Sequence, residues 1–189
     1  MYEMYEMDEQ IVVIGGGPAG TLAANRLRAA LGDTGHRIVV IDRTDPRDQE
    51  LELLVALGVY GPATLQPPEH LRLREGIGFR LANAAAVDTD RQEVCLTDGT
   101  TIPYGVLVLA TGRHPVPATT GGPQLAVVAG SLPATSRADV FAVTPVTAAT
   151  WEATERPISS QVERLVSGVR RYLDRRAPAE SGVARTSAG

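Results

Sequence analysis

Three glycines near the amino terminus have the spacing of a phosphate-binding loop. The segment GGGPAG places Gly15, Gly17 and Gly20 in the pattern G-x-G-x-x-G. In such a loop the first glycine permits a tight turn, the second lets a diphosphate approach the backbone, and the third lets a helix pack closely against a strand. The pattern therefore predicts a loop that binds the diphosphate of a dinucleotide, with a ligand-free tight turn as the alternative.

The loop is flanked by the elements that this chemistry requires. Residues 11–14 (IVVI) and Arg37–Asp42 (RIVVID) are apolar runs typical of parallel strands buried on both faces. Between them, apolar residues recur at helical spacing, and Pro18 suits a first helical turn because its missing N–H would be unpaired there. Together these segments predict a right-handed βαβ unit whose helix presents its positive end to the phosphates.

An acidic residue ends the second of these strands. Asp42 occupies the position from which a carboxylate accepts hydrogen bonds from a ribose 2′-hydroxyl. An acid there disfavours a 2′-phosphate. At this point the dinucleotide could be FAD or NAD.

Composition argues against several other functions. The chain has 189 residues, enough for one domain with a sizeable core, and its net charge of -4 gives no basic footprint for nucleic acid. The single cysteine, Cys95, excludes an internal disulfide, a CxxC pair and a cysteine-based zinc cluster. His36, His70 and His114 lack metal-ligand spacing, so we expect no metal site.

The middle of the chain favours short strands. The segment from Gly78 to Gly112 predicts three or four of them, with a hairpin at Asp98-Gly99, as a β-meander leading into a buried strand at residues 106–110. A loop is predicted at residues 115–123, and further strands at residues 125–130 and in ADVFAVTP at residues 138–145. A short helix is expected at residues 51–57.

The end of the chain favours one long helix. Apolar residues form a stripe after residue 157, and the capping-box spacing of Ser160 and Glu163 predicts that the helix starts at Ser160. We expect residues 1–9, which are acidic, and residues 177–189 to be disordered tails. The start of the chain lacks the pattern of a secretory signal, and no apolar run approaches the ~20 residues of a membrane span, which favours a cytoplasmic protein.

Three segments resemble a known family. VVIGGGPAG, VVIDR and TDGTTIPYGVLVLATG are similar to the FAD domain of pyridine nucleotide-disulfide oxidoreductase-type flavoproteins, in particular type II NADH dehydrogenases and sulfide:quinone oxidoreductases. The resemblance implies an α/β fold, a Rossmann-like FAD-binding domain of the glutathione reductase type, with a parallel sheet, a β-meander and a C-terminal helix. It also implies FAD as the cofactor. The residues expected to bind it are Gly15, Gly17, Pro18, Ala19, Gly20, Asp42, Arg43, Ala84 (near the backbone position that meets the adenine), Ala110, Thr111, Gly112 and Thr144.

The resemblance also implies a missing module. In the family an NAD(P)H domain with its own glycine fingerprint follows the ATG strand, and the FAD domain then resumes with a strand of the form DVFAVGD. Here only a loop at about residues 113–124 and one strand separate Gly112 from ADVFAVTP. We therefore expect a single FAD-binding domain over residues 10–176. Thr144 and Pro145 replace the family's Gly-Asp, which weakens an anchor for the ribityl chain, or they merely end a strand.

These features predict a small FAD-binding oxidoreductase, or oxidoreductase subunit, that depends on an external reductant or a partner. The open flavin face would receive a small-molecule substrate or a partner chain, and a homodimer or heteromer would cover it. The alternatives are a non-catalytic FAD protein and a redox-neutral biosynthetic enzyme, because no catalytic acid, base or redox cysteine can be named. The first turn of the last helix, residues 157–161, is expected to point at the flavin. We expect its arginine-rich face to be solvated, with membrane binding as the alternative.

Overall fold

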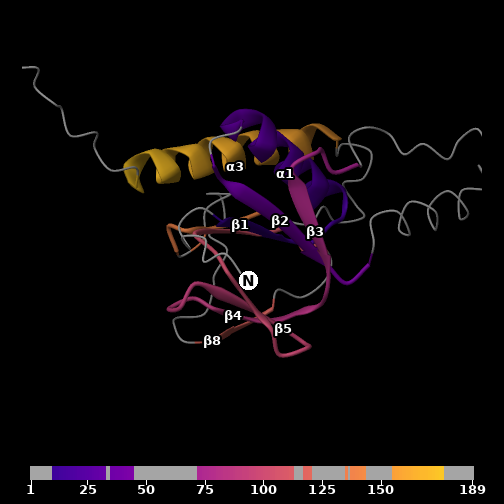
Figure 1. The fold of residues 1–189 in the computed structure, drawn as a ribbon. Helices are drawn as coiled ribbons and strands as arrows, with labels where there is room; N and C mark the ends of the chain where they lie inside the picture. Colours follow the sequence, from indigo (N-terminus) through magenta and orange to yellow (C-terminus); the bar gives the residue numbers. More distant parts are fainter. Residues whose placement is uncertain are drawn as a thin grey trace, which may run out of the picture.

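The computed structural model of the chain contains two sheets and two helices in its described residues (Figure 1). It describes residues 10–32, 35–44, 72–112, 117–120, 135, 137–143 and 155–176. The segments expected at residues 51–57 and 125–130, together with His70, His114, Thr144, Pro145 and both tails, lie outside the described residues.

The larger sheet is parallel throughout. It contains β1 (Gln10–Ile14), β2 (Arg37–Asp42), β3 (Ile77–Leu81), β7 (Val106–Leu109) and β9 (Val140–Ala142). The strand order is β3-β2-β1-β7-β9. The central strands are buried along their length, as their unbroken apolar runs predict, and their carboxyl ends meet at one edge of the sheet.

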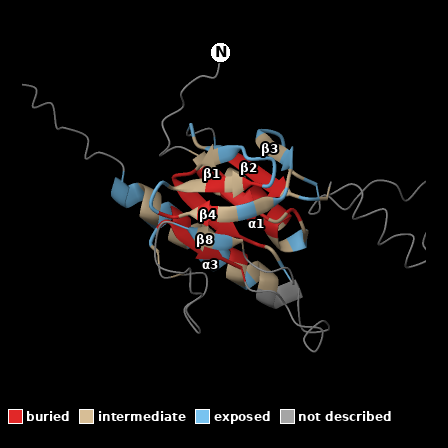
Figure 2. Ribbon diagram, turned by 90° about the horizontal axis from the view of Figure 1, so that it is seen from below, coloured by how far each residue is buried: buried red, intermediate tan, exposed pale blue. Residues whose placement is uncertain are grey.

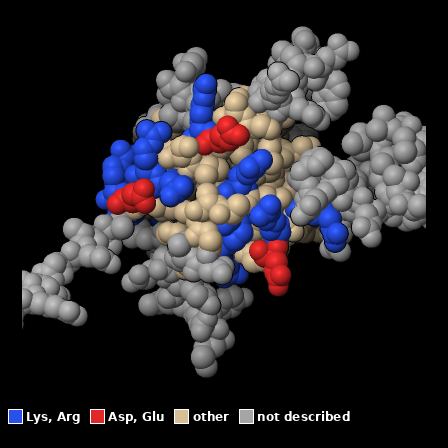
Figure 3. All heavy atoms as spheres, turned by 90° about the horizontal axis from the view of Figure 1, so that it is seen from above, with Lys and Arg blue, Asp and Glu red and all other residues tan. Residues whose placement is uncertain are grey.

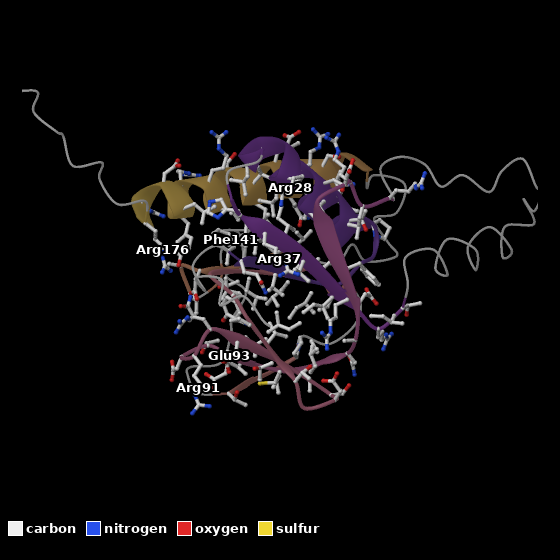
Figure 4. All side chains as sticks on the ribbon, in the orientation of Figure 1. Arg28, Arg37, Arg91, Glu93, Phe141 and Arg176 are labelled. Atoms are coloured by element: carbon white, nitrogen blue, oxygen red, sulfur yellow. The ribbon has the colours of Figure 1, made fainter. Side chains whose placement is uncertain are left out.

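Both helices cover the same face of this sheet (Figure 1). α1 (Pro18–Leu31) connects β1 to β2 and ends at Gly32, which has φ 56°. α3 (Glu155–Arg176) packs beside α1 and over β9. Gly168 permits this close approach, because a Cβ there would lie 3.0 Å from the ring of Phe141, which lies below α3 in Figure 4. Phe141 also meets Tyr172 edge to face at 6.4 Å between ring centroids.

A second sheet covers the other face. It contains β4 (Ala84–Asp88), β5 (Glu93–Leu96), β6 (Thr101–Pro103) and β8 (Ala118–Thr120), in the order β6-β5-β4-β8. Val12 and Leu107 of the parallel sheet pack with Val87, Val94 and Tyr104 in the core between the two sheets. The parallel sheet is therefore the middle of three layers, and β1, β2, β7 and β9 are its buried strands, whereas β3 at its edge is partly exposed (Figure 2).

The first βαβ unit and the hairpin at Asp98-Gly99 are confirmed. Three other details differ from the expectation. α3 begins at Glu155 rather than at Ser160, because Pro157 in a first turn loses no helical hydrogen bond and the helix extends past it. β3, expected in the meander, pairs instead with β2. β8 lies where a loop was expected, because Thr119 and its neighbours pair with the open edge of β4.

A partly buried ion pair joins the meander to the start of β9. Asp139, which is 5% exposed, accepts hydrogen bonds from Arg137 Nε at 3.2 Å and from Gln92 Nε2 at 3.0 Å. Arg137 Nη2 also donates to the carbonyl of Thr89 at 2.7 Å. The hydrogen bond to Asp139 raises the pKa of Arg137 further above its usual range. The network fixes the second sheet against the parallel sheet at the end opposite the strands' carboxyl ends.

Candidate cofactor site

A pocket of about 410 Å³ opens at the carboxyl ends of β1 and β2, between the two sheets. Its lining comes from the glycine loop, from Asp42 and Arg43, from residues 82–85 between β3 and β4, from Thr111, and from Pro117 and Ala118. This is the edge at which open α/β sheets bind ligands, and the volume falls in the range of roughly 300–1,000 Å³ of ligand pockets.

Each glycine of the fingerprint has the geometry that its expected role requires. Gly15 has φ 108°, and a Cβ there would overlap the carbonyl oxygen of Ala110. A Cβ on Gly20 would overlap the carbonyl oxygen of Gly15, so only glycine allows α1 to pack against the loop. A Cβ on Gly17 would have no atom within 4 Å. The first and third glycines are therefore packed against protein backbone, whereas the space beside the second glycine is open to a ligand.

The amino end of α1 presents uncompensated donors at this opening. The N-cap, Gly17, offers no side-chain cap, and no acidic residue lies in the first turn. The N–H groups there and the positive end of the helix are thus available to an anion. Thr21 Oγ1 donates to the carbonyl of Gly16 at 2.9 Å, which holds the loop against the helix. The open space at Gly17 and the positive helix end fit the expected binding of a diphosphate.

Asp42 is bound to the loop as well as facing the pocket. Its Oδ2 accepts the backbone N–H of Gly16 at 2.5 Å, and its Oδ1 accepts that of Thr44 at 2.9 Å. A carboxylate has about four lone-pair sites, so each oxygen retains capacity for a ribose hydroxyl. A Cβ on Gly16 would be crowded, because it would lie 3.1 Å from Asp42 Cβ and 3.5 Å from the ring of Phe79.

The structure brings most of the expected binding residues to this site. Five line the pocket: Gly15, Asp42, Arg43, Ala84 and Thr111. Gly17, Pro18, Ala19 and Gly20 form the loop and the first turn of α1, outside the pocket lining. Ala110 is buried behind the loop, and Gly112, with φ 62°, turns the chain after Thr111. Thr144 lies outside the described residues.

Sequence reasoning missed part of the pocket wall. Asn83 lines the pocket, as do Ala82, Ala85, Pro117 and Ala118. Asn83 is the one polar side chain in the wall at residues 82–85, but an Asn between two strands is an ordinary turn signal. The run of three glycines, Gly15 to Gly17, could have indicated that there is little space for a side chain at Gly16.

The remaining candidates lie elsewhere. Cys95 is half-buried in β5, and neither it nor His36 lines the pocket. Among the described residues, no group of three His, Cys, Asp or Glu side chains could hold a metal ion, and no helix has the length and apolar character needed to cross a membrane. Arginines gather on the outer face of α1 and α3 (Figure 3), where Arg26, Arg164, Arg170, Arg171 and Arg175 are exposed.

Comparison with known proteins places these features in context. The profile of the pyridine nucleotide-disulphide oxidoreductase family matches residues 9–137. Putidaredoxin reductase CamA of Pseudomonas putida is 33% identical over 118 residues, which cover 58% of this chain and 27% of that protein. Ferroptosis suppressor protein 1 of Taeniopygia guttata is 33% identical over 103 residues, which cover 54% of this chain and 26% of that protein. The chain thus spans about a quarter of the length of these relatives.

The solved structures include a sulfide:quinone oxidoreductase from Aquifex aeolicus. It is 28% identical, with a TM-score of 0.39, and the match covers 57% of this chain and 25% of that one.

Proposed function

Because this chain belongs to the pyridine nucleotide-disulphide oxidoreductase family, we propose that it is an FAD-dependent oxidoreductase that takes electrons from an external reductant or a partner protein. Members of the family are FAD-binding flavoproteins, and FAD is the cofactor. When bound, FAD exchanges electrons with a donor and an acceptor. The glycine loop and the amino end of α1 would hold its diphosphate, and Asp42 its ribose.

The observation that carries the proposal is the pairing of β7 with β9. Leu107, Val108 and Leu109 pair directly with Val140, Phe141 and Ala142. Residues 110–139 alone connect the two strands, and they contain no second G-x-G-x-x-G. This supports a single FAD domain over residues 10–176, in which no NAD(P)H domain interrupts the sheet. With no NAD(P)H domain between these strands, we propose that the flavin is reduced by a donor or a partner protein that reaches its open face.

The name of one relative supports a second protein as the electron-transfer partner. Putidaredoxin reductase, which matches 58% of this chain, is named for its action on a separate protein, putidaredoxin. By analogy, we propose a partner chain that docks where the flavin is accessible.

Anaerobic reduction of the purified protein tests the proposal. We expect stoichiometric FAD that dithionite bleaches, and a rate of bleaching by NADH that rises linearly with NADH concentration because no nicotinamide site saturates. A rate that saturates at micromolar NADH would contradict the need for an external module. FAD that no reductant bleaches would favour a non-catalytic role instead.

A variant pair tests whether the flavin lies in this pocket. A Cβ at Gly17 has no protein atom within 4 Å, so Gly17→Val should fold, and its larger side chain should block the diphosphate and abolish FAD binding. Ala29→Val, at an exposed position farther along α1, is the matched control and should keep it. Stoichiometric FAD in folded Gly17→Val would show that the cofactor binds elsewhere.

A further inference from the structure

The pocket wall beyond Asp42 is formed by residues 82–85, an Ala-Asn-Ala-Ala segment. The wall begins directly beside the acid, because the N–H of Ala82 donates to the carbonyl of Asp42 at 2.8 Å. A dinucleotide whose diphosphate lies on α1 and whose ribose meets Asp42 would therefore extend its base along this wall. The alanine methyl groups give the face of a base an apolar surface.

Asn83 stands in this wall with its backbone fixed and its side chain exposed. Its carbonyl accepts the N–H of Thr97 at 2.9 Å, which ties the residue to the turn after β5. None of the hydrogen bonds found among the described residues uses its side-chain amide. The side chain of this pocket-lining residue therefore has both its amide donor and its carbonyl acceptor available.

We propose that the side-chain amide of Asn83 reads the edge of the adenine ring and thereby selects an adenine dinucleotide. This inference rests on the proposed function, since it concerns the same bound FAD. Adenine presents an amino donor next to a ring-nitrogen acceptor, and an Asn amide presents the complementary acceptor and donor. Arg43 cannot replace it, because a guanidinium has no acceptor for the adenine amino group.

Competition between two flavins tests this role without measuring activity. The flavin-free protein is reconstituted with equal amounts of FAD and of 6-deamino-FAD, in which purine replaces adenine, and the bound flavins are released and quantified by chromatography. Wild-type protein should retain about three- to tenfold more FAD, the effect of one hydrogen bond. Asn83→Ala should retain the two equally, because the partner of the amino group is gone.

A conservative variant separates recognition from structure. Asn83→Asp keeps an acceptor for the amino group but not the donor, so it should bind both flavins more weakly and still prefer FAD. Equal retention by wild-type protein, or an unchanged preference in Asn83→Ala, would overturn the role of Asn83 and leave the proposed function intact. Wild-type protein that retains neither flavin would overturn both.

Discussion

The carboxylate of Asp42 accepts a hydrogen bond from the backbone N–H of Gly16 at 2.5 Å, which joins the end of β2 to the glycine loop. The acid expected to bind a ribose therefore also fixes the conformation of the loop expected to bind a diphosphate. The hydrogen bond therefore couples the expected ribose site to the expected diphosphate site. Replacing the acid should affect both the ligand and the protein.

We expect Asp42→Asn to weaken FAD binding and to lower the free energy of unfolding of the FAD-free protein by about 1–3 kcal/mol. The two carboxylate oxygens accept the N–H groups of Gly16 and Thr44, and the amide nitrogen that replaces one of these oxygens cannot accept a hydrogen bond. FAD titration and urea denaturation measure the two effects. Asp174→Asn, at an exposed position of α3, is the control and should change neither. Unaltered unfolding of Asp42→Asn would show that the hydrogen bond to the loop does not stabilise it.

Gly20→Ala should destabilise the fold far more than Gly17→Ala. The added methyl group overlaps the carbonyl oxygen of Gly15 in the first case and meets no atom within 4 Å in the second. We expect a loss of about 3 kcal/mol or more for Gly20→Ala, typical of severe overpacking, and less than about 1 kcal/mol for Gly17→Ala. Urea denaturation of the FAD-free proteins checks this order, and equal losses would contradict the packing of α1 on the loop.

Tyr104→Phe should stabilise the protein. The ring of Tyr104 is fully buried, and its hydroxyl has no hydrogen-bond partner among the described residues. Removing that hydroxyl should raise the free energy of unfolding by about 1 kcal/mol. Denaturation at pH 8 measures the gain; a loss of similar size would show that the hydroxyl is bonded.

The same residue predicts an alkaline pH dependence. Burial raises the pKa of Tyr104 above its usual value. Below pH of about 10 the phenol is protonated in both states, whereas above it the unfolded chain ionises first and the folded protein holds the proton. Stability should therefore fall as the pH rises above about 10, and Tyr104→Phe should lose this component. Comparing unfolding of the two proteins at pH 8 and pH 11 isolates it.

Arg137→Met should lower the free energy of unfolding by about 1–3 kcal/mol, because the buried carboxylate of Asp139 loses its partly exposed cation and keeps the hydrogen bond from Gln92. The double variant Arg137→Met, Asp139→Leu should recover part of that loss, since the unpaired charge is removed as well. Thermal or urea unfolding of Arg137→Met, Asp139→Leu and the double variant gives the interaction energy of the pair. Additive losses would indicate that the two residues do not depend on each other.

The sequence was sufficient for features built from neighbouring residues. The glycine loop, α1 and Asp42 follow one another within a single βαβ unit, so spacing and periodicity predict them. The formation of β8 around Thr119 and the placement of β3 beside β2 depend on pairing between distant segments, which local sequence patterns do not encode. Asn83 reaches the pocket only because the turn between β3 and β4 lies beside Asp42, a proximity that exists only in the folded chain.

The adjacency of β7 and β9 has a consequence for how such proteins acquire and lose parts. The two strands are hydrogen-bonded neighbours, so the sheet is complete whatever length of chain joins them. The entropic cost of lengthening that connection grows only slowly with the number of residues. A nicotinamide-binding domain inserted after Gly112 would therefore leave the paired strands unchanged and would add a binding site for NAD(P)H next to the core.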